Sequence, residues 1–522
     1  VNVQDLQKAP VKSIDDALAG RVAGVMVTSN DGQPGSNAEI VIRGVGSVTQ
    51  SSAPLYVIDG FPQEDANFNS INPAEVESIE VLKDASATAI YGARGSNGVI
   101  IVTTKRGKSA KPVVNYNGYV GAQKPTKLMK LMDPYEYVRL QNDINPYYAN
   151  LFFFSNGKTQ EDYKNEKGVD WQDLVLNNAP AFQNHFISIS GRPNKTAYTF
   201  SASYADQVGL IINSGFKRYQ SRFTLDQDLN DKLKVGVNVN YSYVKSYGQI
   251  PSVQNVPTGQ VVNNGNWNFM LSLWTFRPVA TSNATDANSF VYDDLVDDPS
   301  EGGAPGGRVN PYISTLNEVN NRFATTLTGN AYLNYKIMKD LTLRLTAGVN
   351  TVSSETDIFH NSKTNSGSPL TTYGATYGVN GSISNTSYTS FVNENTLAYN
   401  KKIGKKHLIN AVAGFTQQSI RGKNSGFAAT NLPNESLGIK GIGQGTPYTV
   451  SSSAPPLNGM LSYLGRLNYT FKDNYLFTFS FRADGSSKFA PQNRWGYFPS
   501  GAVAWKLGNE NFMKKIKFIS DA

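Results

Sequence analysis

The sequence predicts an all-β transmembrane barrel preceded by a small α+β domain, and three observations support this prediction. Beyond about residue 111, apolar and polar side chains alternate in repeated segments, as in strands with one apolar face. Short and long connections between these segments largely alternate as well. Charged residues make up only 17% of the chain, whereas aromatic residues reach 11%. These features favour a β protein that faces lipid.

Residues 1–108 are predicted to form the small α+β domain. Ser13 is expected to cap a short helix, and Asn72 followed by Pro73 marks the start of a second helical segment. Apolar stretches rich in β-branched residues, several of them closed by glycine, indicate short strands. The strands are expected over residues 25–28, 39–43, 55–59, 79–82 and 99–103. This is enough apolar material for one small core.

Residues 109–522 are predicted to form the barrel portion. In residues 235–243, valine and tyrosine alternate with glycine, asparagine and serine. About twelve such segments occur, most of about 9–14 residues, which is long enough for a tilted strand to cross a bilayer. The polar faces contain Arg344, Arg466 and Arg482, which a polar lumen accepts and a soluble core does not. No apolar run approaches the ~20 residues of a membrane-spanning helix.

The connections between these segments support the same architecture. Short turns alternate with long polar stretches, as in outer-membrane barrels that have short periplasmic turns and long extracellular loops. A large secreted β-sandwich or a propeller is the alternative, but no regular repeat supports a propeller. The turns are expected at residues 191–194, 230–231, 339–340, 404–405 and 472–474, and the long loops at 124–182, 244–320, 352–387 and 421–458.

Residue counts argue against several other chemistries. Cysteine is absent and the three histidines (His185, His360 and His407) are scattered, so no metal site is expected. The acidic stretch at 286–301 is interpreted as a solvated loop in preference to a calcium site. The net charge of +8 comes without a block of Lys or Arg, so nucleic-acid binding is not implied. No nucleophile, base or paired carboxylates form a convincing catalytic set, so we expect no enzyme activity and no cofactor.

One long segment resembles a known family. Residues 72–105, NPAEVESIEVLKDASATAIYGARGSNGVIIVTTK, closely resemble the plug signature of SusC/RagA-type TonB-dependent outer-membrane transporters. The stretches ALAGRVAGV (17–25), IRG (42–44) and YVIDG (56–60) fit the same plug. The resemblance implies that residues 1–108 are a plug domain inside a barrel of about 22 strands. Residues 109–522 would then be the N-terminal part of that barrel, with about twelve of those strands.

The resemblance also implies a function and partners. Such proteins import large nutrients, usually glycans or peptides, across the outer membrane of Gram-negative Bacteroidota. A SusD-like surface lipoprotein closes the mouth as a lid, and TonB pulls on a segment that we expect upstream of Val1. The alternative is a SusC-like barrel that serves as a structural or assembly subunit without transport. An open half-barrel would leave unpaired strand edges in lipid, which is prohibitive. The chain is therefore either part of a longer polypeptide or completed by another chain, and we expect the first.

Two sets of candidate site residues follow. Plug arginines of this family often meet barrel carboxylates, so Arg43 and Arg94 are candidates to lock the plug, with Glu394 as a candidate partner. The alternative is that these arginines serve packing and solubility. Substrate is expected to contact outward-facing plug loops and aromatic barrel loops. For the aromatics, packing of the loop itself or a place under the lid protein is the alternative, and we prefer it. The substrate candidates are Ser47, Gln50, Phe61, Gln63, Asn67, Trp267, Phe269 and Trp274.

Overall fold

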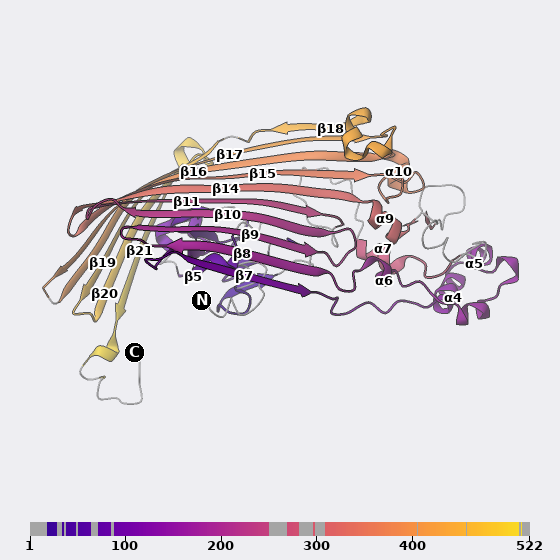
Figure 1. Ribbon diagram of the computed structural model, residues 1–522, viewed down its shortest axis with the longest axis horizontal. Coiled ribbons are helices and arrows are strands. Elements are labelled where there is room, and N and C mark those ends of the chain that lie inside the picture. Colours follow the sequence, from indigo (N-terminus) through magenta and orange to yellow (C-terminus); the bar gives the residue numbers. More distant parts are fainter. Residues whose placement is uncertain are drawn as a thin grey trace.

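A curved antiparallel wall of long strands dominates the computed structural model, and a small N-terminal domain lies against one face of this wall (Figure 1). We refer to the small domain as the plug. The strands of the main path follow one another in chain order, from β7 at one edge to β21 at the other, and each pairs with its neighbours in that path. The structure describes residues 18–28, 34–35, 38–47, 51–63, 71–84, 88–249, 269–280, 296–297, 308–404, 406–455, 457–510 and 513.

The wall confirms the predicted β architecture. Over the described residues, its sheet has 13 strands, twelve in one continuous path, with β18 paired to β17 beside that path. The four longest strands have 20 or 24 residues, which exceeds the length expected from the sequence. The strands are β7 (Val113–Ala122), β8 (Ala181–Gly191), β9 (Thr196–Val208), β10 (Gly215–Asp228), β11 (Leu233–Tyr247), β14 (Val319–Met338), β15 (Leu341–His360), β16 (Asn380–Ile403), β17 (His407–Thr430), β18 (Thr446–Ser453), β19 (Asn458–Phe471), β20 (Tyr475–Ser486) and β21 (Trp495–Trp505).

The two faces of the wall have opposite polarity. On β10, the side chains of Arg218, Gln220 and Arg222 are buried beneath the plug, whereas Tyr219 and Phe223 are 48% and 41% exposed on the other face. Residues two apart on a strand share a face, so this alternation runs along the whole strand. A soluble sheet would bury its apolar face. The wall therefore has the inverted arrangement of a barrel with a polar lumen and a lipid-facing exterior.

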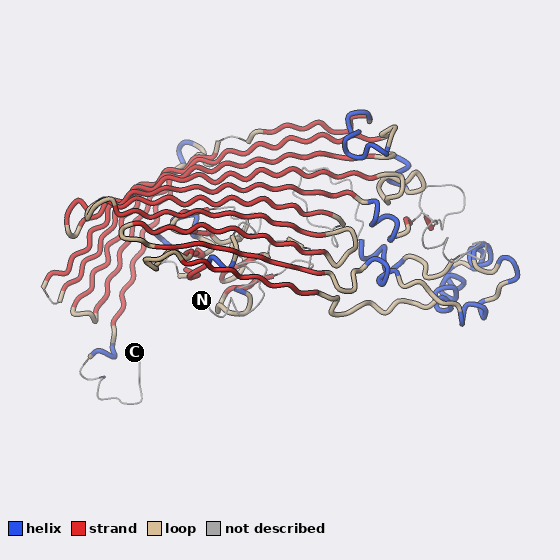
Figure 2. The backbone as a smooth tube through the Cα atoms, viewed as in Figure 1, coloured by secondary structure: helices blue, strands red, loops and turns tan. Residues whose placement is uncertain are grey.

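Short turns and long connections lie at opposite ends of the wall, as predicted. Connections of a few residues close one end, for example residues 339–340 between β14 and β15 and 404–406 between β16 and β17. Helices gather at the other end (Figure 2). Within the described ranges, no helix is long and apolar enough to span a membrane. The helical segments at this end are α4 (Pro134–Ile144), α5 (Pro146–Phe152), η4 (Ser155–Gly157), η5 (Gln160–Asn165), α6 (Trp171–Val175), α7 (Phe269–Thr275), α9 (Pro311–Asn317), α10 (Thr372–Tyr377) and η6 (Glu435–Gln444).

The described residues of the plug form two small sheets. Strands β1 (Val25–Thr28) and β2 (Glu39–Ile42) pair with each other, and a four-stranded sheet has the order β4-β3-β6-β5. Side chains from both sheets meet in one apolar core that includes the fully buried Leu18 and Ile100. The strands of the larger sheet are β3 (Leu55–Ile58), β4 (Phe61–Gln63), β5 (Val76–Leu82) and β6 (Val99–Thr104).

The predicted plug strands are confirmed with shifts of a few residues at their ends, and the short β4 was not predicted. Asn72 caps the short helix η2 (Pro73–Glu75), because its side chain accepts a hydrogen bond from the backbone N–H of Ala74 at 2.9 Å. The helix expected to begin at Ser13 lies largely outside the described residues, as does most of the acidic stretch at 286–301.

Candidate functional site: the interface between plug and wall

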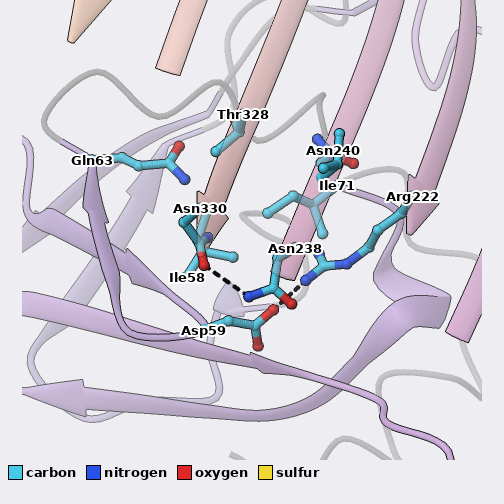
Figure 3. Close-up of a pocket in the computed structure, with 10 residues that line it drawn as sticks. Ile58, Asp59, Gln63, Ile71, Arg222, Asn238, Asn240, Thr328 and Asn330 are labelled. Atoms are coloured by element: carbon cyan, nitrogen blue, oxygen red, sulfur yellow. Dashed lines mark hydrogen bonds and ion pairs between the residues drawn. The ribbon is translucent and has the colours of Figure 1, made fainter. Parts of the chain in front are cut away.

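A buried ion pair joins the plug to β10. Strands β3 and β6 are parallel and pair Ile58 with Val102, so their ends place Asp59 beside Thr104. The Asp59 carboxylate accepts hydrogen bonds from the backbone N–H (2.9 Å) and the hydroxyl (2.8 Å) of Thr104, and it pairs with Arg222 of the wall (Figure 3). The side chains of Asp59 and Arg222 are only 4% and 6% exposed. The charges therefore compensate each other away from water.

Two more plug residues, Arg106 and Glu75, contact the wall in the same region. Arg106, which follows β6, lies 3.4 Å from Asp59 and 3.9 Å from Asp226 of β10. Glu75 of η2 accepts hydrogen bonds from Ser201 of β9 and from the Gln220 amide of β10, the latter at 3.0 Å. The plug thus presents two carboxylates to the same part of the wall, and donors from β9 and β10 satisfy them.

A small cavity lies beside Asp59 and Arg222. Its volume is about 20 Å³, room for about one water molecule, so it cannot hold a nutrient. Asn238 of β11 donates to Asn330 of β14 at 2.8 Å across its floor (Figure 3). The site is thus an interface between plug and wall. Its lining comprises Ile58, Asp59, Gln63, Ile71, Arg222, Asn238, Val239, Asn240, Thr328 and Asn330.

A second contact region lies at β16, β17 and β20. The turn η3 (Ala89–Gly95) of the plug reaches this part of the wall, where Arg94 Nη1 donates to the Gln418 side chain of β17 at 2.9 Å. Burial raises the pKa of Tyr91, and the nearby Glu394 carboxylate of β16 raises it further. Arg94 also interacts electrostatically with Glu394. The plug therefore bridges two parts of the wall that are well separated in the strand order.

Of the three residues expected to lock the plug, two lie at the interface between plug and wall and one does not. Arg94 and Glu394 lie on facing sides of the plug–wall interface. Arg43 forms its ion pair with Asp84, which also belongs to the plug, and both side chains are more than half exposed. The lock expected from the sequence therefore remains a proposal, with Arg94 and Glu394 better placed for it than Arg43.

Of the three plug residues expected to contact substrate that the structure describes, two are covered. Phe61 is 1% exposed, and its ring lies against β15, where a Cβ atom added at Gly348 would come within 2.4 Å of it. Gln63 is 8% exposed and lines the small cavity. Ser47 is partly exposed. The other candidates in this part of the chain, Gln50 and Asn67, lie outside the described residues.

The aromatic loop candidates lie at the end of the wall that carries the long connections. Phe269 of α7 is 2% exposed and packs in a cluster with Trp171, Leu273 and Phe276. Trp274 is on the same helix and is partly exposed. Trp267 lies outside the described residues. Phe269 thus supports the loop, and of the described aromatic candidates Trp274 is the one with exposed surface.

The sequence did not single out the residues with the most buried contacts. Arg222 stands on a polar strand face, which the alternation of β10 indicates, but nothing in the sequence pairs it with Asp59. From the sequence, Glu75 is explained by its place in the first turn of η2, where a carboxylate is favoured beside backbone N–H groups that have no partner within the helix. The identity of each partner depends on how deeply the plug sits in the wall, which local patterns do not encode.

Comparison with known proteins identifies the family. The model of the TonB-dependent receptor plug domain matches residues 1–99. TonB-dependent receptor P26 of Formosa agariphila is 34% identical over 98% of this chain and 49% of its own length. TonB-dependent receptor SusC of Bacteroides thetaiotaomicron is 32% identical over 100% of this chain and 50% of its own length. The chain is a SusC/RagA-type TonB-dependent receptor sequence.

Solved structures agree with this assignment. The structure of the RagAB peptide transporter matches the receptor with a TM-score of 0.77 and 26% identity, over 98% of this chain and 58% of that one. The ferric citrate transporter FecA matches with a TM-score of 0.55 and 10% identity, which shows the shared fold alone. The receptor chain spans about half the length of the curated relatives it matches.

Proposed function

We propose that the receptor belongs to an outer-membrane importer in which the plug closes the lumen until TonB displaces it. The buried contacts between plug and wall support this proposal most directly. A plug fixed by an ion pair such as Asp59–Arg222 keeps the lumen closed at rest, and breaking such a pair costs several kcal/mol. External work, as TonB would supply through a segment upstream of Val1, is a suitable means of opening it.

The proposed cargo is a large nutrient, a glycan or a peptide, delivered under a SusD-like lipoprotein lid. Similarity to SusC and to the RagAB peptide transporter supports this class of cargo and this kind of partner. Substrate contacts are proposed at Ser47 and Trp274, which have exposed surface, and at Gln50, Asn67 and Trp267. Phe61, Gln63 and Phe269 would contact cargo only after the plug or the loop rearranges, because they are covered in this structure.

Growth and purification experiments test this function. A strain deleted for the full-length receptor is grown on a panel of purified polysaccharides and peptide mixtures as sole nutrient, with the wild type and a strain without TonB as comparisons. We expect loss of growth on the same nutrient in both mutants. We also expect a surface lipoprotein to copurify with the tagged receptor in mild detergent. Growth of both mutants on every nutrient, with the receptor bound to several unrelated subunits, would favour the structural role instead.

A further inference from the structure

Two inward-facing residues of β20 hold the plug by its backbone. Asp484 Oδ2 accepts a hydrogen bond from the backbone N–H of Ala93 at 3.0 Å, and Arg482 Nη1 donates to the backbone carbonyl of Ile90 at 2.6 Å. Arg482 Nε also donates to Asp484 Oδ1 at 2.7 Å, so each side chain orients the other. Because residues two apart on a strand share a face, β20 presents the pair to the plug as one unit.

The backbone held in this way has an unusual conformation. Gly92 has φ 61° and ψ −143°, a region that glycine adopts far more readily than other residues. A Cβ atom added there would lie 2.2 Å from both Arg482 Nε and Asp484 Oδ2. The two wall residues therefore fit closely around a glycine turn, and straightening the turn would separate their partners.

Burial and charge suit this pair to repeated opening. Arg482 and Asp484 are 2% and 5% exposed, so the plug shields their contacts from water. When the plug leaves, the two charges still compensate each other on β20. The Asp59–Arg222 pair differs, because its charges lie on opposite sides of the interface and separate when the plug moves. Contacts at β20 can thus break without leaving an isolated charge on the wall.

We propose that Arg482 and Asp484 form a backbone clamp that holds the turn Ile90–Arg94 against β20. The clamp must open before the plug can leave this side of the wall. Because the clamp contacts backbone atoms of the turn, the side chain of Ala93 contributes little to holding the plug. Gly92 is essential, because a side chain there would collide with the two wall residues. The clamp concerns closure of the lumen, so its test does not require the cargo or TonB.

Passive conductance of the full-length receptor in planar lipid bilayers tests the clamp. The fraction of open channels is measured in rising urea, which loosens the plug, for Asp484→Ala and Gly92→Ala. Each variant should raise the open fraction about 10- to 100-fold below the wild-type opening point, the factor expected for a lost hydrogen bond to a charged group. Because both changes remove the same contact, the double variant should open little further than the stronger single variant.

Two wall variants serve as matched controls. Ser462 pairs with Asp484 in the strand register and is fully buried, but its hydroxyl has no hydrogen-bond partner in the described part of the chain. Gly465 has nothing within 4 Å of an added Cβ atom. Ser462→Ala and Gly465→Ala should therefore open as the wild type does.

Folding of the barrel is checked by the heat-dependent shift of its electrophoretic mobility. If Asp484→Ala fails this check, Asp484→Asn replaces it, since the amide keeps the size and loses the charge. Folded variants of Asp484 and Gly92 that open at the wild-type urea concentration would overturn the proposal. So would a double variant whose effect equals the sum of the single effects.

Discussion

Replacing Arg222 by methionine should loosen the plug strongly. The change removes the wall partner of Asp59 and a hydrogen bond from Arg222 to the Thr104 hydroxyl (2.8 Å), in a place where both charged side chains are nearly inaccessible to water. Removing one partner of a buried pair costs about 3–5 kcal/mol, because the other charge stays buried. Thr104 still donates twice to Asp59, and Arg106 lies 3.4 Å away, so we expect the lower end of that range.

The expected loss of about 3 kcal/mol corresponds to roughly a 150-fold change in the equilibrium between seated and displaced plug. Urea-dependent conductance of the full-length receptor measures it as a lower opening midpoint. Arg322→Met is the control, since this arginine of β14 is exposed. Asp59→Asn combined with Arg222→Met should cost less than the sum of the two single changes. An unchanged midpoint for Arg222→Met, or additive effects in the double variant, would refute the role assigned to the ion pair.

Three further predictions concern other parts of the chain. Arg94→Ala should raise passive antibiotic entry into cells that make the full-length receptor, whereas Arg43→Ala should change it little, since exposed ion pairs contribute about 0–1 kcal/mol. Gly348→Ala should lower the urea midpoint by overpacking worth about 1–3 kcal/mol against Phe61, and adding Phe61→Leu should restore the midpoint; no restoration would point to another cause. Burial raises the pKa of Tyr163 to about 12. The buried neutral phenol therefore stabilises the fold fully below pH 10, and this stabilisation is lost as the pH rises towards 12. Limited proteolysis of its loop should therefore accelerate over this window in the wild type, and Tyr163→Phe should abolish the acceleration; equal pH dependence in both would contradict the assignment.

The strands of the wall were predictable because the alternation of apolar and polar residues that marks each strand lies within one short segment of the sequence. In residues 235–243, each valine or tyrosine faces away from the plug, and the intervening polar residues face it, as a period of two requires. The lengths of β16 and β17, 24 residues each, were underestimated, because polar residues near one end carry no apolar face to mark a strand. Pairing with the neighbouring strands maintains these ends, and Ile383 and Phe427 also pack against an apolar cluster that includes Ile442 of η6.

The interface was less predictable because it joins residues far apart in the chain. The alternation places Arg222 and Arg482 on the polar face, but Asp59 and Ile90 meet them only once the plug is seated. Arg43 and Arg94 look alike in the sequence, yet one pairs with exposed Asp84 and the other reaches the wall. Phe269 resembled a ligand-stacking aromatic, but its burial with Trp171 was set by the packing of two distant loops.

Conductance of the full-length receptor with and without its plug tests most directly whether the plug closes the lumen. Purified receptor is reconstituted in planar bilayers beside a variant that lacks residues 18–105, and barrel folding is confirmed for both by heat-dependent mobility. We predict that the intact receptor stays closed without urea and that the plugless variant forms a large, permanently open channel. Equal conductance of the two folded proteins, whether open or closed, would contradict closure by the plug.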